Sequence, residues 1–232
     1  MKLSIIIPTY NEAENIGKLI SYLHKNLLNK AYEIIVSDGG STDSTFEDAL
    51  KAGATVLKSQ KKGRASQMNY GASKASGEVL YFLHADSYPP ATFHEDILHA
   101  VKKGIKSGSY RLKFDYNHWF LKFNSWFTRF DIDLIRFGDQ SLFISKEIFE
   151  KVSGFDETLI VMEDMEIIPR IKKLGRFKVM NAYVRTSARK YLENGIYKLQ
   201  AIFFIIYFMY WLGFSQEKLI RTYRSLIKQN KV

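Results

Sequence analysis

The feature that most constrains this chain is the alternation of short apolar runs with segments of helical periodicity over its first ninety residues. The apolar runs cover residues 3–7, 33–37, 54–57 and 79–83. After the first run, apolar residues recur with the spacing of one helix face, namely at Ile16, Leu19, Ile20, Leu23 and Leu27. Strands that alternate with helices predict an α/β fold with a parallel sheet, because each helix packs back onto the sheet.

Polar residues follow three of these strands, at 9–12, 38–43 and 84–87. In an open α/β sheet the carboxyl ends of the strands face the ligand crevice. We therefore expect the acids Glu12, Asp38 and Asp86 to line one crevice. The alternative for each acid is a solvated loop position or a helix cap. For Asn11 we expect the role of N-cap of the first helix.

The strand at 79–83 leads into His84, Ala85 and Asp86. Residues two apart point the same way while the chain is extended, so His84 and Asp86 are expected to share one side. A carboxylate at such a strand end can hold a divalent cation, which in turn can bind a diphosphate. The alternative is that Asp86 caps the next helix or belongs to a turn ahead of Pro89.

Composition indicates the class of partner. The 232 residues include no cysteine, and 34 Lys and Arg against 24 Asp and Glu leave a formal charge of +10. A chain of this length forms one large domain with at most a small appendage. The charge favours an anionic partner, such as nucleic acid, an anionic membrane face or a phosphorylated substrate. The first apolar run is too short for a signal peptide, so a cytoplasmic location is expected.

Residues 117–130 are rich in aromatic side chains with helical spacing, namely Trp119, Phe120, Phe123, Trp126, Phe127 and Phe130. This spacing predicts a helix whose aromatic residues pack in the core. The alternative is a wall of the acceptor-binding site.

The C-terminal region changes character. Residues 199–216 carry no charge, and as a helix they would extend about 27 Å, slightly less than a hydrocarbon core. Basic residues follow at Lys218, Arg221, Arg224, Lys228 and Lys231. The pattern predicts shallow docking on an anionic membrane surface, at the inner face of the cell membrane. The alternative is a helix buried against the catalytic domain or in a homodimer interface.

Several motifs together resemble family 2 glycosyltransferases, which have the GT-A fold. The matching segments are residues 5–12, 38–43, 84–86, 154–157 and 163–164. Residues 63–69 and 186–189 also resemble a subgroup of small bacterial and archaeal members. The resemblance implies a transferase domain at 1–190, with a nucleotide-sugar-binding half at 1–90 and an acceptor half at 91–190. Residues 191–232 would form a helical segment, first hydrophobic and then basic.

The resemblance implies transfer of a sugar from a UDP- or GDP-sugar to an acceptor hydroxyl. Membrane docking through the C-terminal segment would make a lipid or lipid-linked acceptor one option. Asp86 stands at the family's Asp-x-Asp position and would bind Mg2+ or Mn2+. His84 replaces the first Asp of that motif, and we rank holding water or packing above direct ligation because diphosphate-bound magnesium prefers oxygen ligands.

The remaining site residues follow from the same resemblance. The nucleotide-sugar pocket would be formed by Pro8, Thr9, Glu12, Asp38, Arg64, Ala85 and Asp86. Arg64 follows a flexible glycine and would add a phosphate contact, with a solvated helix start as its alternative. Asp164 would be the base that deprotonates the acceptor, with Glu163 in reserve. One base and no second nucleophile imply inversion at the anomeric carbon.

Two other classes are less well supported. A nucleotidyltransferase needs a glycine-rich, basic loop after the first strand, whereas residues 8–12 here are acidic and contain no glycine. A nucleic-acid-binding protein is suggested by net charge alone, and no recognition motif is present, so no nucleic acid partner is expected.

Overall fold

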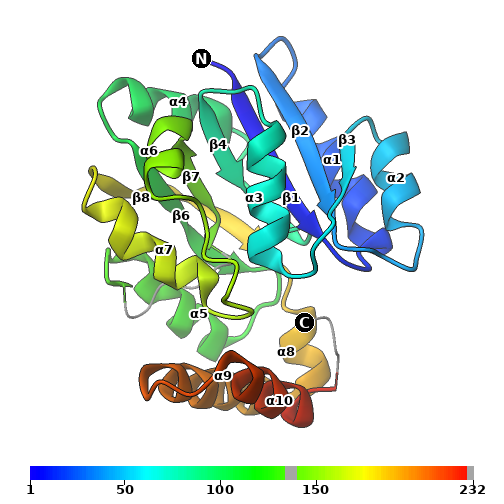
Figure 1. Ribbon diagram of the computed structural model, residues 1–232, viewed down its shortest axis with the longest axis vertical. Helices are drawn as coiled ribbons and strands as arrows, with labels where there is room; N and C mark the ends of the chain where they lie inside the picture. The colour runs from blue at the N-terminus through cyan, green and yellow to red at the C-terminus, as the bar shows by residue number, and fades with distance from the viewer. Residues whose placement is uncertain (134–139, 229–232) are drawn as a thin grey trace.

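The computed structural model describes residues 1–133 and 140–228, and one eight-stranded sheet organises this part of the chain. Helices cover both faces of the sheet, and three C-terminal helices lie beyond its lower end (Figure 1). The strand order is β3-β2-β1-β4-β7-β6-β8-β5. The non-sequential order places β1 in the interior of the sheet, between β2 and β4.

The first half of the chain forms the predicted parallel unit. Its strands are β1 (Leu3–Thr9), β2 (Tyr32–Asp38), β3 (Thr55–Lys58) and β4 (Val79–Phe82). The helices between them are α1 (Ala13–Asn26), α2 (Thr45–Lys51) and α3 (Arg64–Lys74). β1 pairs in parallel with both β2 and β4, so the loops after these strands meet at one edge. This confirms the α/β alternation expected from the sequence.

The second half mixes strand directions. It contains β5 (Ser87–Tyr88), α4 (Phe93–Lys102), β6 (Ser107–Phe114), β7 (Leu142–Ser145), α6 (Lys146–Lys151), α7 (Glu163–Lys172) and β8 (Phe177–Thr186). β7 is antiparallel to β4 and β6, whereas β6 and β8 are parallel. Of the seven pairings in the described sheet, four are parallel, in agreement with the expected mostly parallel sheet.

Alternate residues of β1 pack on opposite faces of the sheet. Ile5 and Ile7 join a cluster with the apolar side of α1, whereas Ile6 joins a second cluster with residues of α3 and α7. Side chains along a strand alternate in direction, so a strand that is apolar at both parities must be covered on both sides. The mainly apolar run at 3–7 is therefore typical of a central strand.

Asn11 does not cap the first helix, contrary to expectation. Glu12 precedes α1, and Asn11 has a left-handed backbone with φ +53°. The Asn11 side-chain oxygen instead accepts a hydrogen bond of 2.8 Å from the backbone N–H of Thr42. Asparagine tolerates this conformation better than most residues, so it joins two loops here rather than starting a helix.

The prediction that the aromatic residues at 117–130 pack in the core is wrong for most of them. They form α5 (Trp119–Trp126) and a short 3-10 turn, η1 (Phe127–Arg129). In α5 only Leu121 is buried, and Trp119 is 65% exposed. The helix lies at the periphery of the molecule, so one side packs and the other faces outward.

The C-terminal region forms α8 (Arg189–Asn194), α9 (Ile196–Trp211) and α10 (Gln216–Leu226) rather than one long apolar helix (Figure 1). α9 ends before Gly213, whose φ of +76° turns the chain, and Ser215 caps α10. Within the described residues, no helix has the length and apolar character needed to cross a membrane. Lys231 lies outside the described residues.

Gly108 in β6 provides a test of how closely β6 packs against β7 and β8. A Cβ atom added there would lie 2.2 Å from the carbonyl oxygen of Lys178 and 2.6 Å from the ring of Phe143. We expect Gly108→Ala to lower the free energy of unfolding by about 3 kcal/mol, measured by urea denaturation. The control is Gly17→Ala in α1, where the added Cβ would meet nothing within 4 Å and should stabilise by about 0.5–1 kcal/mol. Equal stability of the two variants would contradict this account.

Candidate active site

The loops after β1 and β2 are joined by hydrogen bonds that converge on Asp38. Its side chain is only 2% exposed. One carboxylate oxygen accepts from the hydroxyls of Thr9 and Ser41, and the other accepts from the backbone N–H groups of Gly40 and Ser41. An ionised carboxylate offers about four acceptor positions, and these four donors use them. A direct contact of Asp38 with a nucleotide would therefore require one donor to move.

Gln67 joins the same two strand ends from α3. Its side-chain amide donates to the carbonyl oxygens of Thr9, at 2.6 Å, and Ser37, at 2.9 Å. A Cβ atom on Gly39 would lie 2.6 Å from the Gln67 amide nitrogen, so this glycine is needed for the contact. The buried amide thus holds the carboxyl ends of β1 and β2 at a set separation.

Asp86 lies past the end of β4, in a turn rather than on an extended strand. The backbone N–H of Ser87 donates to the carbonyl of His84, so the strand rule that placed His84 and Asp86 on one side does not apply. The next residues, β5, pair with the end of β8, and the N–H of Ser187 donates to the carbonyl of Asp86. Asp86 and His84 are half-buried, and Ala85 between them is buried.

Arg189 connects the end of β8 to the loop after β1. Its guanidinium lies 3.7 Å from a carboxylate oxygen of Glu12 and 3.6 Å from one of Glu14. Glu12 is 15% exposed and also accepts a hydrogen bond of 2.7 Å from the side chain of Asn15. The segment 186–189 therefore lies beside both Asp86 and Glu12, at the carboxyl edge of the sheet.

Arg64, the first residue of α3, contacts both acids at the start of α7. Its guanidinium lies 3.1 Å from Asp164 and 3.4 Å from Glu163. The same two segments meet again through Lys61 and Glu157, at 2.8 Å, and Asn69 holds the turn that precedes Glu157. The two acids at the start of α7 are thus tied to α3, the helix that follows β3.

The two acids differ in environment. Glu163 has a side chain 3% exposed, whereas Asp164 is 19% exposed. Burial, with the neighbouring charge of Asp164, raises the pKa of Glu163 to about 7, and Arg64 opposes this rise. A catalytic base must come within hydrogen-bond reach of the proton that it accepts, so the more exposed Asp164 is the better candidate for this role.

A cavity of about 510 Å³ opens beside Arg189. Its lining residues are Asp115, Tyr116, Ser187, Arg189, Leu192 and Glu193. Ser187 is the residue whose N–H contacts the Asp86 carbonyl, so the cavity adjoins the turn that carries Asp86. It combines one cation, two carboxylates, an aromatic ring and a leucine, a lining suited to a ligand with a polar head and an apolar part.

Sequence comparison now identifies the family. Residues 4–150, more than half of the chain, match the family model described as glycosyl transferase family 2. The chain belongs to this family. This confirms the family expected from the motifs.

Curated relatives match over part of their length. The chain is 36% identical over 109 residues to a dolichol-phosphate mannosyltransferase of Pyrococcus furiosus, covering 45% of this chain and 31% of that protein. It is 34% identical over 113 residues to an undecaprenyl-phosphate 4-deoxy-4-formamido-L-arabinose transferase of Yersinia pestis, covering 44% and 34%. The matched region spans about a third of the length of these relatives.

Solved structures confirm the GT-A fold. A mannosyltransferase from Pyrobaculum calidifontis, solved with GDP-Man and Mn2+, superposes with a TM-score of 0.72 at 16% identity, covering 92% of this chain and 64% of that chain. Residues 1–349 of S. aureus TarS, in complex with UDP-GlcNAc, superpose with a TM-score of 0.67 at 16% identity, covering 97% and 71%.

The described residues contain no cluster of three or more His, Asp or Glu side chains that would hold a metal by themselves. The Asp86 carboxylate nevertheless fits a site completed by substrate. Magnesium is commonly bound through one or two carboxylates together with substrate phosphates, and it retains several waters. The Asp86 carboxylate would offer a hard oxygen ligand to such a site, whereas His84 would offer a nitrogen, which magnesium disfavours.

Sequence reasoning missed the roles of Gln67, Asn69 and Arg189. All three stand in the subgroup-like segments 63–69 and 186–189, but no contact was predicted for them. A polar residue on the sheet-facing side of a helix, as at Gln67, is the signal that was available. For Arg189 the sequence carries no such signal, because its partners lie about 175 residues earlier in the chain.

The raised pKa of Glu163 predicts a pH-dependent effect on stability. An unfolded glutamate ionises near pH 4.5, whereas the folded one ionises near 7, so this group's stabilising contribution is lost as pH rises through that window. The stability of Glu163→Gln relative to wild type should therefore increase between pH 5 and pH 8, by at least roughly 1 kcal/mol in urea denaturation. The exposed control Glu150→Gln should track wild type, and parallel curves for Glu163→Gln would contradict the assignment.

Proposed function

We propose that this protein is a metal-dependent, inverting glycosyltransferase that moves a sugar from a nucleoside diphosphate to an acceptor hydroxyl. One observation carries the proposal: Arg64 brings Asp164 to the carboxyl edge of the donor-side strands. A base from α7 and a diphosphate site at β4 then share one edge of the sheet. Relatives that use lipid-phosphate substrates, and neighbours solved with GDP-Man or UDP-GlcNAc, support this class of reaction.

The donor would lie along the loops after β1, β2 and β4. Asp86 would hold Mg2+ or Mn2+ together with the diphosphate, with His84 placed to orient water. When bound, such a cation supplies charge stabilisation to the leaving diphosphate. Arg64 would add a charge-assisted contact to the same phosphates. Pro8, Thr9, Glu12, Asp38 and Ala85 would shape the nucleotide pocket around them.

Asp164 would act as the base in a single displacement. The acceptor oxygen forms a bond to the anomeric carbon as the bond from that carbon to the diphosphate oxygen breaks, and the acceptor proton passes to the Asp164 carboxylate. Attack opposite to the leaving group inverts the anomeric centre. In the free protein Arg64 lies against Asp164, so a diphosphate that draws Arg64 away would leave the base available to the acceptor.

The acceptor would be a lipid or lipid-linked hydroxyl, and the protein would act at the inner face of the cell membrane. The named relatives with lipid-phosphate substrates support this choice. The cavity at Arg189, with its polar and apolar lining, is the proposed acceptor site. The division at residue 90 into donor and acceptor halves remains part of the proposal.

A donor panel tests the proposal. UDP, GDP, UDP-sugars and GDP-sugars are added with and without Mn2+, and the melting temperature is recorded. Selective binding should raise the melting temperature by mass action, and more so with the cation. Release of UDP or GDP from the stabilising sugar nucleotide should then require an acceptor. A panel without any stabilising nucleotide would overturn the proposal, and stabilisation by nucleoside triphosphates alone would favour a nucleotidyltransferase.

Asp86→Asn tests the cation site. The change removes one charge from a half-buried turn at the strand end, so the fold should persist while transfer falls by at least 100-fold and Mn2+-dependent stabilisation is lost. The matched control is Glu47→Gln, an exposed carboxylate on α2, which should transfer at the wild-type rate. Full activity of Asp86→Asn, or of wild type in excess chelator, would exclude this role.

Asp164→Asn tests the base. Because the proton moves in the chemical step, kcat should fall by about 100-fold or more while the Kd for the donor changes little. The comparison is Glu163→Gln, because the Glu163 carboxyl is buried and less accessible to an acceptor than that of Asp164. A larger loss of kcat in Glu163→Gln, with Asp164→Asn nearly unchanged, would reverse the assignment.

A further inference from the structure

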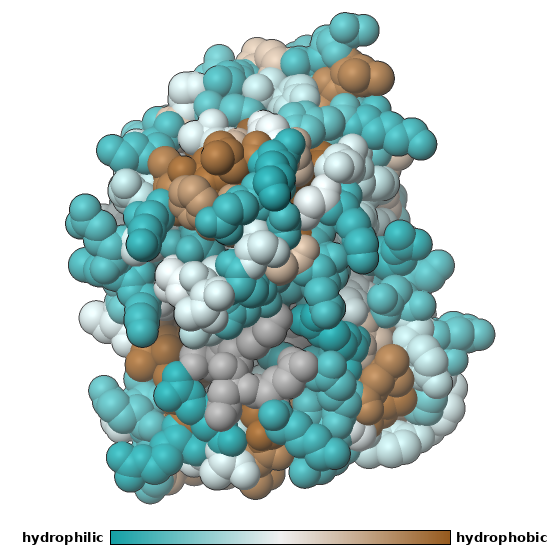
Figure 2. All heavy atoms as spheres, turned by 90° about the vertical axis from the view of Figure 1, so that its right-hand side faces the viewer, coloured by the Kyte–Doolittle hydropathy of each residue, from teal (hydrophilic) through white to brown (hydrophobic). Residues whose placement is uncertain are grey.

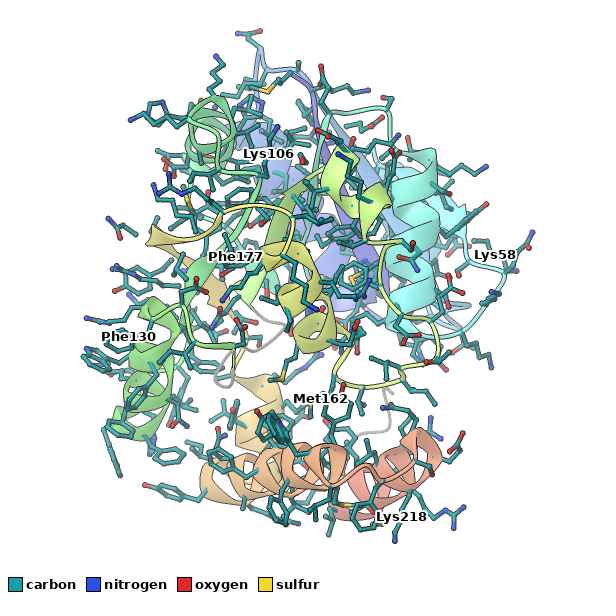
Figure 3. The ribbon with its side chains drawn as sticks, turned by 60° about the vertical axis from the view of Figure 1, so that its left-hand side comes forward. Lys58, Lys106, Phe130, Met162, Phe177 and Lys218 are labelled. Carbon is teal, nitrogen blue, oxygen red and sulfur yellow. The ribbon has the colours of Figure 1, made fainter. Side chains whose placement is uncertain are left out.

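Two helices that are about 75 residues apart in sequence adjoin each other at the lower end of the molecule. The ring of Phe120 in α5 lies 4.9 Å from that of Tyr197 in α9, and Asn124 donates a 3.0 Å hydrogen bond to Gln200. Leu121 of α5 belongs to the same buried cluster as Leu199 of α9. Met162, ahead of α7, also packs on this cluster, between the catalytic domain and the C-terminal helices (Figure 3).

The outer side of α9 is mainly apolar, with Lys198 near its start. The large exposed side chains of α9, together with that of Leu212, which follows it, are Tyr197, Phe204, Ile205, Phe208, Trp211 and Leu212, of which Phe208 and Trp211 are more than 60% exposed. At about 100° per residue these positions span about a third of the helix circumference, so they share one face. The opposite face packs into the protein through Leu199, Ile202 and Ile206.

The outer side of α5 repeats this pattern. Trp119, Phe123, Trp126 and Phe130 follow one another at intervals of three or four residues, and each is exposed by more than 40%. Phe130 lies at the outer margin of the molecule (Figure 3). Together with the six exposed side chains of α9, these four residues form what we call the aromatic face. So many exposed aromatic residues on adjoining helices mark an interaction site.

The charges on these helices have one sign. Neither α5 nor α9 contains Asp or Glu, and each carries one exposed lysine on its outer side, Lys122 and Lys198. Arg129 stacks over the ring of Trp126 at 4.5 Å. On α10, Lys218 lies at the lower rim of the molecule (Figure 3). Exposed aromatic residues flanked by cations match the interface of an anionic bilayer.

The face that carries α2 is different. It is mainly hydrophilic, with separate apolar patches (Figure 2). A second copy of the chain also fits the aromatic face poorly, because self-association would bring cations against cations with no acid from either helix between them. A bilayer with anionic headgroups matches both the apolar and the basic residues.

A row of rings connects the aromatic face to the cavity at Arg189. Tyr116 in the cavity wall stacks on His118 at 6.4 Å between ring centroids, and His118 in turn lies 6.1 Å from Trp119 and 5.9 Å from Tyr197. Leu192, a further lining residue, is also exposed. The cavity therefore adjoins the surface that α5 and α9 expose.

We propose that the aromatic face, built jointly by α5 and α9, docks flat on an anionic lipid bilayer and places the cavity at the headgroup level. α9 has 16 residues, about 24 Å, and one side of it is buried in protein, so it lies in the interface rather than across the membrane. The role of docking in acceptor delivery rests on the proposed function, whereas docking itself does not.

Vesicle flotation of the full-length protein tests this proposal. The vesicles contain phosphatidylcholine alone or with one third phosphatidylglycerol. Two double variants and one single variant are compared with wild type. The double variants are Phe123→Glu with Trp126→Glu on α5 and Phe204→Glu with Phe208→Glu on α9. The single variant is Leu50→Glu on α2. Leu50 is the matched control, since it is as exposed as Phe204, at 58%, but lies far from the aromatic face.

Wild type and Leu50→Glu should float with anionic vesicles, less so at 0.5 M NaCl. Each of the two double variants should partition at least about tenfold more weakly, because two aromatic residues lose their burial in the bilayer. Loss in the α9 variant with none in the α5 variant would overturn the joint surface. Absence of wild-type flotation, or a dimer in analytical ultracentrifugation that both double variants dissociate, would overturn docking altogether.

Donor binding separates the two proposals. All three variants should retain the wild-type rise in melting temperature with the stabilising nucleotide and Mn2+, because the substituted side chains lie outside the nucleotide loops. Flotation without nucleotide stabilisation would leave docking standing and overturn the proposed function. Nucleotide stabilisation without flotation would overturn docking and leave the proposed transfer reaction standing.

Discussion

The parallel pairing of β1 with β2 and β4 is the constraint on which the rest of the structure depends. Backbone register brings Thr9 opposite Asp38, and Asp86 follows β4 by a short turn, so the polar loops open at one edge. Asp38 then accepts a hydrogen bond from the Thr9 hydroxyl, and Gln67 donates one to the Thr9 carbonyl oxygen. Because a buried polar group is costly when it is unpaired, this network fixes the shape of the edge as well as its stability.

Charge pairs across the edge bring the second half of the chain to the first. Arg64 reaches the acids of α7, Lys61 reaches Glu157, and Arg189 reaches Glu12. Partly exposed pairs of this kind contribute little to stability, so their main effect is to position the second half of the chain against the first. In the proposed function, Arg64 of these pairs contacts the diphosphate and Asp164 accepts the acceptor proton. The arrangement suits a family in which the transferred group passes between two substrates.

Of the C-terminal helices, α9 is packed on one side and mainly apolar on the other. α9 and α10 bury their inner sides in a cluster of their own, which includes Leu121 of α5 and the end of the loop before α7. A helix that buries one apolar side in protein and exposes a second apolar side leaves that second side poorly solvated by water. The same packing that attaches these helices to the domain therefore leaves the exposed aromatic residues next to the cavity at Arg189.

The sequence by itself determined the α/β alternation, the central place of β1, the three polar strand ends and the family, because each depends on local periodicity or on motifs of fixed spacing. Only the tertiary structure decided which side chains meet. The pairing of Arg64 with Asp164, of Arg189 with Glu12, and of α5 with α9 joins residues about 75 to 175 positions apart. Helical spacing at 117–130 is the same for a buried helix and an exposed one, so periodicity alone placed those aromatic residues wrongly in the core. Burial depends on what covers a helix, and that is set by contacts between distant segments.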